Sequence, residues 1–132
     1  MSRRRSAHPT EAELEILNVL WRRGPSTVRQ VHEVLQADRR TGLTTTLKTL
    51  QNMTGKRLVI RDSTGYPHRY VAASSEEDTQ AGLLKDLVRK AFDGSVQRLL
   101  IRAVEGGGLS QEELREIRRI IDGLRKSKRG AT

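Results

Sequence analysis

The chain has 132 residues, 35% of them hydrophobic and 3% aromatic, and a formal net charge of +9 at pH 7. This length suits one domain, or one small domain with an appendage, and the many helix formers and charged residues predict a mainly helical fold. The lack of cysteine excludes disulfides, thiolate metal sites and a cysteine nucleophile. No apolar run is long enough to span a membrane, so we expect a cytoplasmic protein.

The positive charge is concentrated in the first half of the chain. Residues 1–73 hold 13 Lys and Arg against 6 Asp and Glu, whereas residues 74–132 hold 12 against 10. Such a bias is expected of a segment that contacts a polyanion. A membrane-surface protein would also need a strongly amphipathic helix with basic and aromatic residues, and we find none. Residues 1–8 and 127–132 are interpreted as a disordered basic arm and a basic tail.

Two capping boxes predict the first two helices. In such a box a Ser or Thr side chain caps the helix, and a Glu or Gln three residues later bonds back to the cap. Thr10 with Glu13 opens a helix that ends before Gly24, and Thr27 with Gln30 opens the next. Apolar residues at helical spacing predict the buried faces: Leu14, Ile16, Leu17, Leu20 and Trp21 in the first helix, and Val28, Val31, Val34 and Leu35 in the second.

A polar turn at residues 38–42 leads to a third helix, which we predict to be capped by Thr44 and to end near Gly55. Its core face is predicted from helical spacing and includes one hydroxyl: Leu43, Thr46, Leu47, Leu50 and Met53. The remaining face has hydroxyl, amide and ammonium groups, and no acidic residue occurs from residue 42 to residue 61. We predict that this face reads DNA bases through Thr44, Thr45, Lys48, Thr49 and Asn52.

From Leu58 the apolar period changes to two, which predicts strands at residues 58–61 and 68–71 around a turn at 62–67. Three short helices followed by a hairpin are the pattern of a winged helix-turn-helix domain, which we place at residues 9–73. Basic residues flank or form the hairpin, called the wing below: Lys56, Arg57, Arg61, His68 and Arg69. We expect DNA contacts from this group, with Arg61 and Arg69 on phosphates, where contacts position a protein without specifying sequence.

Residues 74–126 are predicted to form three amphipathic helices separated by residues 93–95 and 106–108, and Ser110 with Glu113 is a further capping box. A unit of this size buries only about 60% of its unfolded surface and is marginal alone. We therefore predict a helical dimerisation domain, although the helices could instead fold back on the first half. The residues expected to pack between two copies are Leu84, Leu87, Val88, Leu99, Leu100, Leu114, Ile117, Ile121 and Leu124.

The residues predict neither an enzyme, nor a metal site, nor a cofactor. His8, His32 and His68 are scattered and lack the Cys or carboxylate cluster of a metal site, and His32 is expected to be half-buried on the second helix. The glycines at 106–108 lack the Gly-Lys-Ser/Thr of a phosphate loop. No Ser/His/Asp arrangement suggests nucleophilic catalysis.

Several separated segments share one order and spacing with a known family. They are Thr10–Leu17 with Leu20-Trp21, Val28–His32, Leu43–Leu50, Gly65–Tyr70, Phe92–Ser95 and Leu109–Leu114. Together they span nearly all of residues 9–125, and the chain resembles the bacterial penicillinase-repressor family of the BlaI/MecI type. The resemblance implies a dimeric winged-helix repressor of palindromic operators, that is, inverted repeats in double-stranded DNA. It matches the family's DNA contacts to Thr44, Thr45 and Lys48.

The resemblance also implies control of β-lactamase or cell-wall-stress genes, relieved when a regulatory protease cuts the dimerisation region. This chain departs from the family pattern in three respects. Asn52 stands where many members have Arg, so the operator preference is expected to differ. The cleavage region reads Arg102-Ala103 where some members have Asn-Phe, which leaves another releasing signal as an alternative. The lack of cysteine excludes the thiolate copper sensing of some relatives.

Two other functions stay open on the residues alone. One is a winged-helix protein-interaction module whose basic face binds an acidic partner. The other is a non-specific DNA-binding protein of the nucleoid type, which would use the arm at Arg3–Arg5 and the tail at Lys126–Arg129. A salt-insensitive, weak interaction with DNA would favour the first, and equal affinity for operator and random DNA would favour the second.

Overall fold

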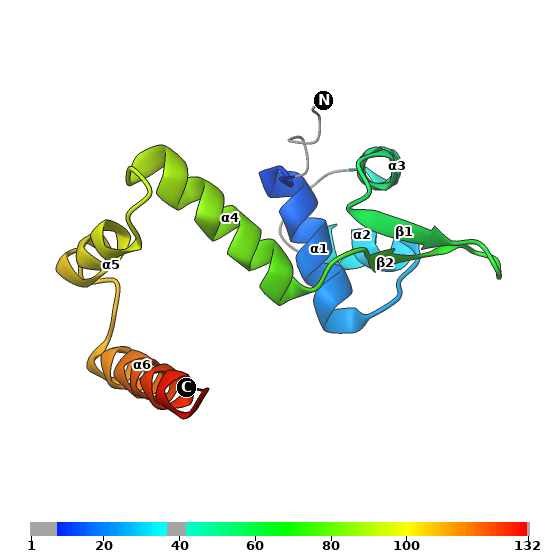
Figure 1. The fold of residues 1–132 in the computed structure, drawn as a ribbon. Coiled ribbons are helices and arrows are strands. Elements are labelled where there is room, and N and C mark those ends of the chain that lie inside the picture. The colour runs from blue at the N-terminus through cyan, green and yellow to red at the C-terminus, as the bar shows by residue number, and fades with distance from the viewer. Residues whose placement is uncertain (1–7, 37–41, 132) are drawn as a thin grey trace. The chain divides into compact units, whose positions relative to one another are not determined.

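The computed structural model describes residues 8–36 and 42–131, which form six helices and one two-stranded antiparallel sheet (Figure 1). They are, in order, α1 (Glu11–Arg23), α2 (Val28–Gln36), α3 (Leu43–Gly55), β1 (Val59–Asp62), β2 (Arg69–Ala72), α4 (Glu76–Ala91), α5 (Val96–Glu105) and α6 (Gln111–Ala131). The prediction of a mainly α fold with a small hairpin is confirmed. Of the predicted basic arm and the polar turn at 38–42, only His8 and Gly42 lie within the described residues.

The chain divides into two compact units, the first up to Leu84 and the second from Lys85, so α4 begins in one and ends in the other. In the first unit, α1, α2, α3 and the hairpin enclose one core, and α3 packs against α1, α2 and β1 (Figure 1). The core cluster consists of Ile16, Leu17, Val19, Leu20, Val31, Leu50, Met53, Val59 and Tyr70. Val19 was not predicted to be buried, and Val34 was predicted to be buried but is 42% exposed near the end of α2.

Three of the predicted capping boxes are present. In α1 the backbone N–H of Glu13 donates to Thr10 Oγ1 at 3.2 Å, and that of Thr10 donates to Glu13 Oε1 at 2.9 Å. Thr27 and Gln30 exchange the same two bonds at the start of α2. Ser110 and Glu113 repeat them at the start of α6. A local hydrogen-bond pattern therefore sets these three helix starts.

The predicted cap of α3 is wrong. The helix begins at Leu43, and the N-cap position belongs to Gly42, which provides no side-chain hydrogen bond. Thr44 consequently lies inside the first helical turn. The carbonyl of Gly42 instead accepts the backbone N–H groups of Thr45 and Thr46, at 3.1 and 3.2 Å.

The wing consists of two antiparallel strands of four residues each. Both strands begin and end one residue later than predicted. Arg61 lies opposite Tyr70, and Asp62 lies opposite Arg69. A further bridge was not predicted: Ser26 and Tyr70 exchange backbone hydrogen bonds of 3.1 and 2.7 Å. The loop between α1 and α2 is thereby held against β2, on the side of the strand that does not pair with β1.

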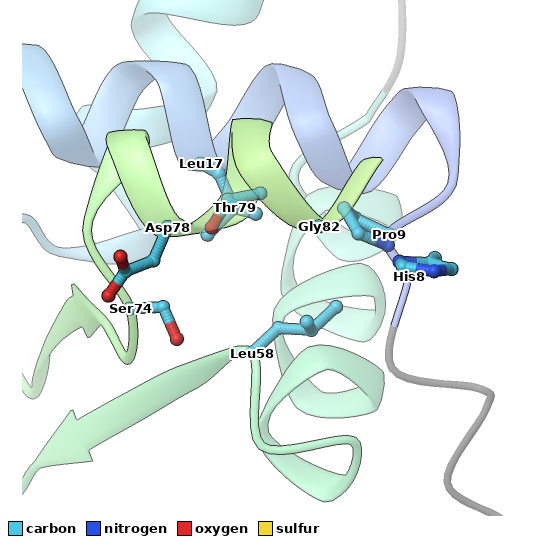
Figure 2. Close-up of a pocket in the computed structure, with 8 residues that line it drawn as sticks. All are labelled: His8, Pro9, Leu17, Leu58, Ser74, Asp78, Thr79 and Gly82. Atoms are coloured by element: carbon cyan, nitrogen blue, oxygen red, sulfur yellow. The ribbon is translucent and has the colours of Figure 1, made fainter. Parts of the chain in front are cut away.

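The first turns of α4 belong to the first unit. The Trp21 indole N–H donates to the carbonyl of Ser74 at 3.0 Å, just before the helix begins. A hollow of about 160 Å³ lies beside this junction, and Figure 2 shows the residues that line it. Its lining residues come from the chain before α1, from α1, from the residue before β1, from the link between β2 and α4, and from the first half of α4: His8, Pro9, Leu17, Leu58, Ser74, Asp78, Thr79 and Gly82.

The second unit has little core of its own. Asp93 and Gly94, at φ values of 53° and 79°, end α4, and the Ser95 side chain caps α5. The helices α4, α5 and α6 make few contacts with one another, and Val88 is buried. α6 continues through most of the predicted basic tail to Ala131. Many of the unit's large apolar side chains are exposed, among them Leu87, Val96, Leu100, Ile101, Val104, Ile120, Ile121 and Leu124, and Leu84 at the end of the first unit is also exposed.

Candidate nucleic-acid interface

The side of α3 that faces away from the core is polar and carries no acid. Thr44, Thr45, Lys48 and Asn52 are exposed, whereas Leu50 and Met53 are fully buried. Thr46 is 3% exposed, which confirms its assignment to the core. The helix therefore presents most of its predicted DNA-reading residues together on one accessible face.

Thr49 lies at the edge of this face and is only half-buried. Its hydroxyl donates to the carbonyl of Thr45 at 2.9 Å. With its proton used inside the helix, the Thr49 oxygen can still accept a hydrogen bond, for example from the amino group of adenine or cytosine. It cannot at the same time donate to a phosphate.

Two polar contacts hold α3 in place besides its apolar packing. His32 Nδ1 lies 3.1 Å from Thr46 Oγ1, which connects α2 to the buried side of α3. His32 is half-buried, as predicted. Lys56 Nζ lies 3.0 and 2.9 Å from the two carboxylate oxygens of Glu13, which connects the end of α3 to the first turn of α1. Sequence reasoning did not predict this ion pair, since its two residues are 43 positions apart.

The wing presents its two predicted phosphate contacts on opposite faces. Directly paired residues of antiparallel strands share a face, and successive residues alternate. Arg61 therefore shares the face of Tyr70, which is buried against the core, whereas Arg69 shares the outer face with Asp62. Both Arg side chains are exposed.

Asp62 begins the tip of the wing and has a pKa below its ordinary value. The largest cause is the backbone N–H of Thr64, which donates to Asp62 Oδ1 at 3.0 Å, followed by the Thr64 hydroxyl at 2.7 Å. The positive charges of Arg69 and His68 lower the pKa further. The carboxylate thus orders the turn between the strands.

Two more predicted residues lie at the two ends of the wing. Arg57 connects α3 to β1 and is exposed, with a φ of 67°. His68 is half-buried, and its ring meets that of Tyr66 edge to face, with centroids 5.6 Å apart.

Sequence reasoning missed two exposed residues of this surface. Gln51 is exposed and follows Lys48 by three residues and Thr44 by seven, the spacing of one helical face. That spacing would have been enough to select it. Tyr66 is 92% exposed in the wing turn. Only its exposure in the folded hairpin marks it, because aromatic residues in sequence more often indicate a core.

Other kinds of site find no support in the described part of the chain. It has no group of three or more His, Cys, Asp or Glu that could hold a metal ion. No helix within it is long and apolar enough to cross a membrane. The hollow in Figure 2 is lined by no residue of α3.

The fold and the site define a winged helix-turn-helix protein in which α3 contains no acidic residue and the wing is basic. A sequence model of the penicillinase repressor family matches residues 9–123, and the chain belongs to that family. Members of this class are transcriptional regulators and not enzymes, which confirms the predicted family and class of function. A family of repressors implies binding to DNA.

The chain is similar to several regulators along most of its length. The transcriptional regulator BlaI of Mycobacterium tuberculosis (strain ATCC 25618 / H37Rv) is 36% identical over 105 residues, or 78% of this chain and 76% of that protein. The methicillin resistance regulatory protein MecI of Mammaliicoccus sciuri is 24% identical over 113 residues, or 86% and 92% of the two chains. MecI of Staphylococcus aureus (strain N315) is 23% identical over 113 residues, which are again 86% of this chain and 92% of that protein.

Proposed function

We propose that this protein is a sequence-specific, homodimeric repressor that binds a palindromic operator in double-stranded DNA. The observation that carries the proposal is the exposed face of α3, where Thr44, Thr45, Lys48 and Asn52 lie together on a helix that contains no acidic residue. The amide of Asn52 can bond to adenine at two positions, and the threonines can contact base edges or the thymine methyl. Thr49 and Gln51 extend the same surface.

The wing supports this role from the side. Arg57, Arg61 and Arg69 place positive charge next to α3, and His68 lies with them in the wing. Contacts from such residues go to phosphates and fix the register of the helix on the duplex. Arg61 and Arg69 lie on opposite faces of the hairpin, so a wing lying along the DNA backbone can contact phosphates on both sides.

Dimerisation is proposed from the uncovered apolar surface of the second unit. Leu87, Leu100 and Ile121 are 48, 41 and 46% exposed, and Leu124 is 63% exposed. Covering such side chains is worth roughly 25 cal/mol for each Å² of apolar surface removed from water, and a second copy offers the same surface in return. A symmetric dimer would place two recognition helices in successive major grooves, about 34–36 Å apart or a multiple of that.

The regulated genes are proposed from the relatives. One is named for methicillin resistance and the family for penicillinase repression. We propose control of β-lactamase or other cell-wall-stress genes, released by proteolysis or by another signal. Arg102 and Ala103, the proposed cleavage region, lie inside α5, and Arg102 pairs with Glu105 at 2.9 Å. Since proteases bind extended chain, α5 would have to unwind before it is cut.

DNase footprinting with the full-length protein on the DNA around its own coding region tests the proposal. Protection of a short inverted repeat, with much weaker binding to random DNA, is the expected result. Equal affinity for the protected site and for random DNA would instead favour a nucleoid-type protein. Weak binding that salt hardly affects would favour a protein-interaction module.

A further inference from the structure

The ion pair between Glu13 and Lys56 involves a carboxylate that also takes part in a helix cap. Glu13 is 5% exposed and already serves α1, because its Oε1 accepts the backbone N–H of Thr10 in the capping box. Both of its carboxylate oxygens also accept hydrogen bonds from Lys56 Nζ, at 3.0 and 2.9 Å. One carboxylate therefore joins the first turn of α1 to the end of another helix.

That other helix is the proposed recognition helix. Lys56 is the C-cap residue of α3, and its backbone N–H donates to the carbonyl of Asn52 at 3.0 Å. The ion pair thus lies one helical turn beyond Asn52 and two beyond Lys48. A change in this contact would displace the C-terminal half of α3, where the proposed base contacts of Asn52 are made.

The ion pair also distinguishes Lys56 from the other basic residues near α3. A lysine ammonium has three N–H donors, and that of Lys56 contacts both oxygens of a nearly buried carboxylate at 3.0 and 2.9 Å. Among the ion pairs of the described residues, this carboxylate has no other cation. Withdrawing Lys56 would leave Glu13 charged and buried without a countercharge, which is strongly unfavourable. As a neutral pair, the two residues release no counterions from DNA.

We propose that Glu13 and Lys56 are positioning residues, which fix α3 against α1 in the orientation needed for reading bases, and that Lys56 does not bind phosphate. The proposal rests on the proposed function of α3 in DNA reading. It makes a prediction of unusual sign: removing a negative charge at Glu13 weakens recognition of the operator, although the protein becomes more positive.

The substitution Glu13→Gln tests this sign. Gln is accepted at the same position of a capping box, so the start of α1 is retained. The matched control is Glu11→Gln, which makes the same change in charge two residues earlier, at an exposed position of the same helix. Affinities of the full-length proteins are measured by fluorescence anisotropy, at a temperature where circular dichroism shows each variant folded. The probes are a duplex selected by the protein from a random library and an unselected random duplex.

For Glu13→Gln we expect the ratio of selected-site to random-DNA affinity to fall by about tenfold, the size of losing one good base contact. Binding to random DNA should stay equal or become tighter, because the charge is more favourable. Glu11→Gln should leave the ratio unchanged. If Glu13→Gln instead behaves as Glu11→Gln does, the pair has no positioning role and the proposal is overturned.

The double variant E13Q/K56M keeps the proposal testable if Glu13→Gln does not fold. It preserves the net charge and leaves no buried charge unpaired. We expect a reduced affinity ratio with an unchanged dependence of log K on log salt. A slope flatter by about 0.9, with equal losses on both DNAs, would show that Lys56 binds phosphate.

Lys48→Met separates failure of this inference from failure of the proposed function. Lys48 is exposed on the proposed reading face, outside the ion pair. If Lys48→Met weakens binding while the Glu13 variants do not, α3 reads DNA and only the positioning role is wrong. If Lys48→Met also has no effect, α3 is not the reading helix and both proposals fail.

Discussion

Asn52 lies in the third turn of α3 with its side chain exposed, on the face that carries no acid. We predict that Asn52→Ala relaxes base preference at one operator position and leaves binding to random DNA nearly unchanged, since a bidentate base contact discriminates by roughly 1–3 kcal/mol. Competition between the operator and its single-base variants measures this. Equal losses on the operator and on random DNA would assign Asn52 to the backbone instead.

Asp62 makes the stability of the wing turn depend on pH, and the direction of that dependence follows from its lowered pKa. Its pKa is lowered in the folded protein, so the stability it adds to the turn is present above the pKa of the unfolded chain. That stability is lost as the pH falls through the lower, folded pKa. Thr64→Ala removes the hydroxyl donor and retains the backbone donor, and we predict that the pKa of Asp62 rises part of the way toward 3.8. An NMR titration of the Asp62 carboxyl group measures it, and an unchanged or lower pKa would contradict the assigned cause.

For single residues, sequence reasoning succeeded where the periodicity of one helix alone decides whether a side chain is buried. Thr46 could be placed in the core because it shares a face with Leu50 and Met53. The same reasoning assigned Glu13 to a capping box but not to Lys56, because a contact across 43 residues depends on how α1 and α3 pack. The faces of Arg61 and Arg69 likewise depend on the strand register, which the short, one-residue-shifted prediction did not fix.

Among elements, helix starts divide into those with a local signal and those without one. The boxes at Thr10, Thr27 and Ser110 were predicted correctly because cap and partner are only three residues apart. The start of α3 was missed because Gly42 has no side chain to recognise. Packing of Leu50 and Met53 into the core, together with the contacts of His32 and Lys56, positions this helix instead.

The wing is the element whose contribution is best measured by salt. We predict that Arg61→Ala and Arg69→Ala each flatten the plot of log K against log salt by about 0.9, as expected for one lost phosphate contact. Arg22→Ala is the matched control, since Arg22 is exposed at the opposite end of α1 from the end that contacts Lys56. A slope that Arg69→Ala leaves unchanged would show that the outer face of the hairpin does not touch DNA.

The two units of the molecule differ in how completely each buries its apolar residues. The first encloses a continuous core of helices and hairpin, and it extends along α4 to Leu84. The Trp21 indole N–H binds the carbonyl of Ser74 just before α4 begins. The second has helices with few mutual contacts and many exposed Leu, Ile and Val side chains. Sequence reasoning predicted from its small size that the second half would be marginal alone, but the helix faces left uncovered emerge only from the fold.

The proposed dimer makes the last prediction, at the scale of the whole molecule. Ile121 and Leu124 are 46 and 63% exposed on α6, so replacing both with Glu should cost a monomer little stability. In a dimer the same change buries two unpaired charges in each copy, and we predict a monomer at micromolar concentration in sedimentation equilibrium. Operator affinity should fall toward that for random DNA, because a single recognition helix reads only one half-site. Gln111→Glu, in the exposed first turn of α6, should remain dimeric. A wild-type protein that sediments as a monomer, or a double variant that stays dimeric, would place the interface elsewhere or exclude it.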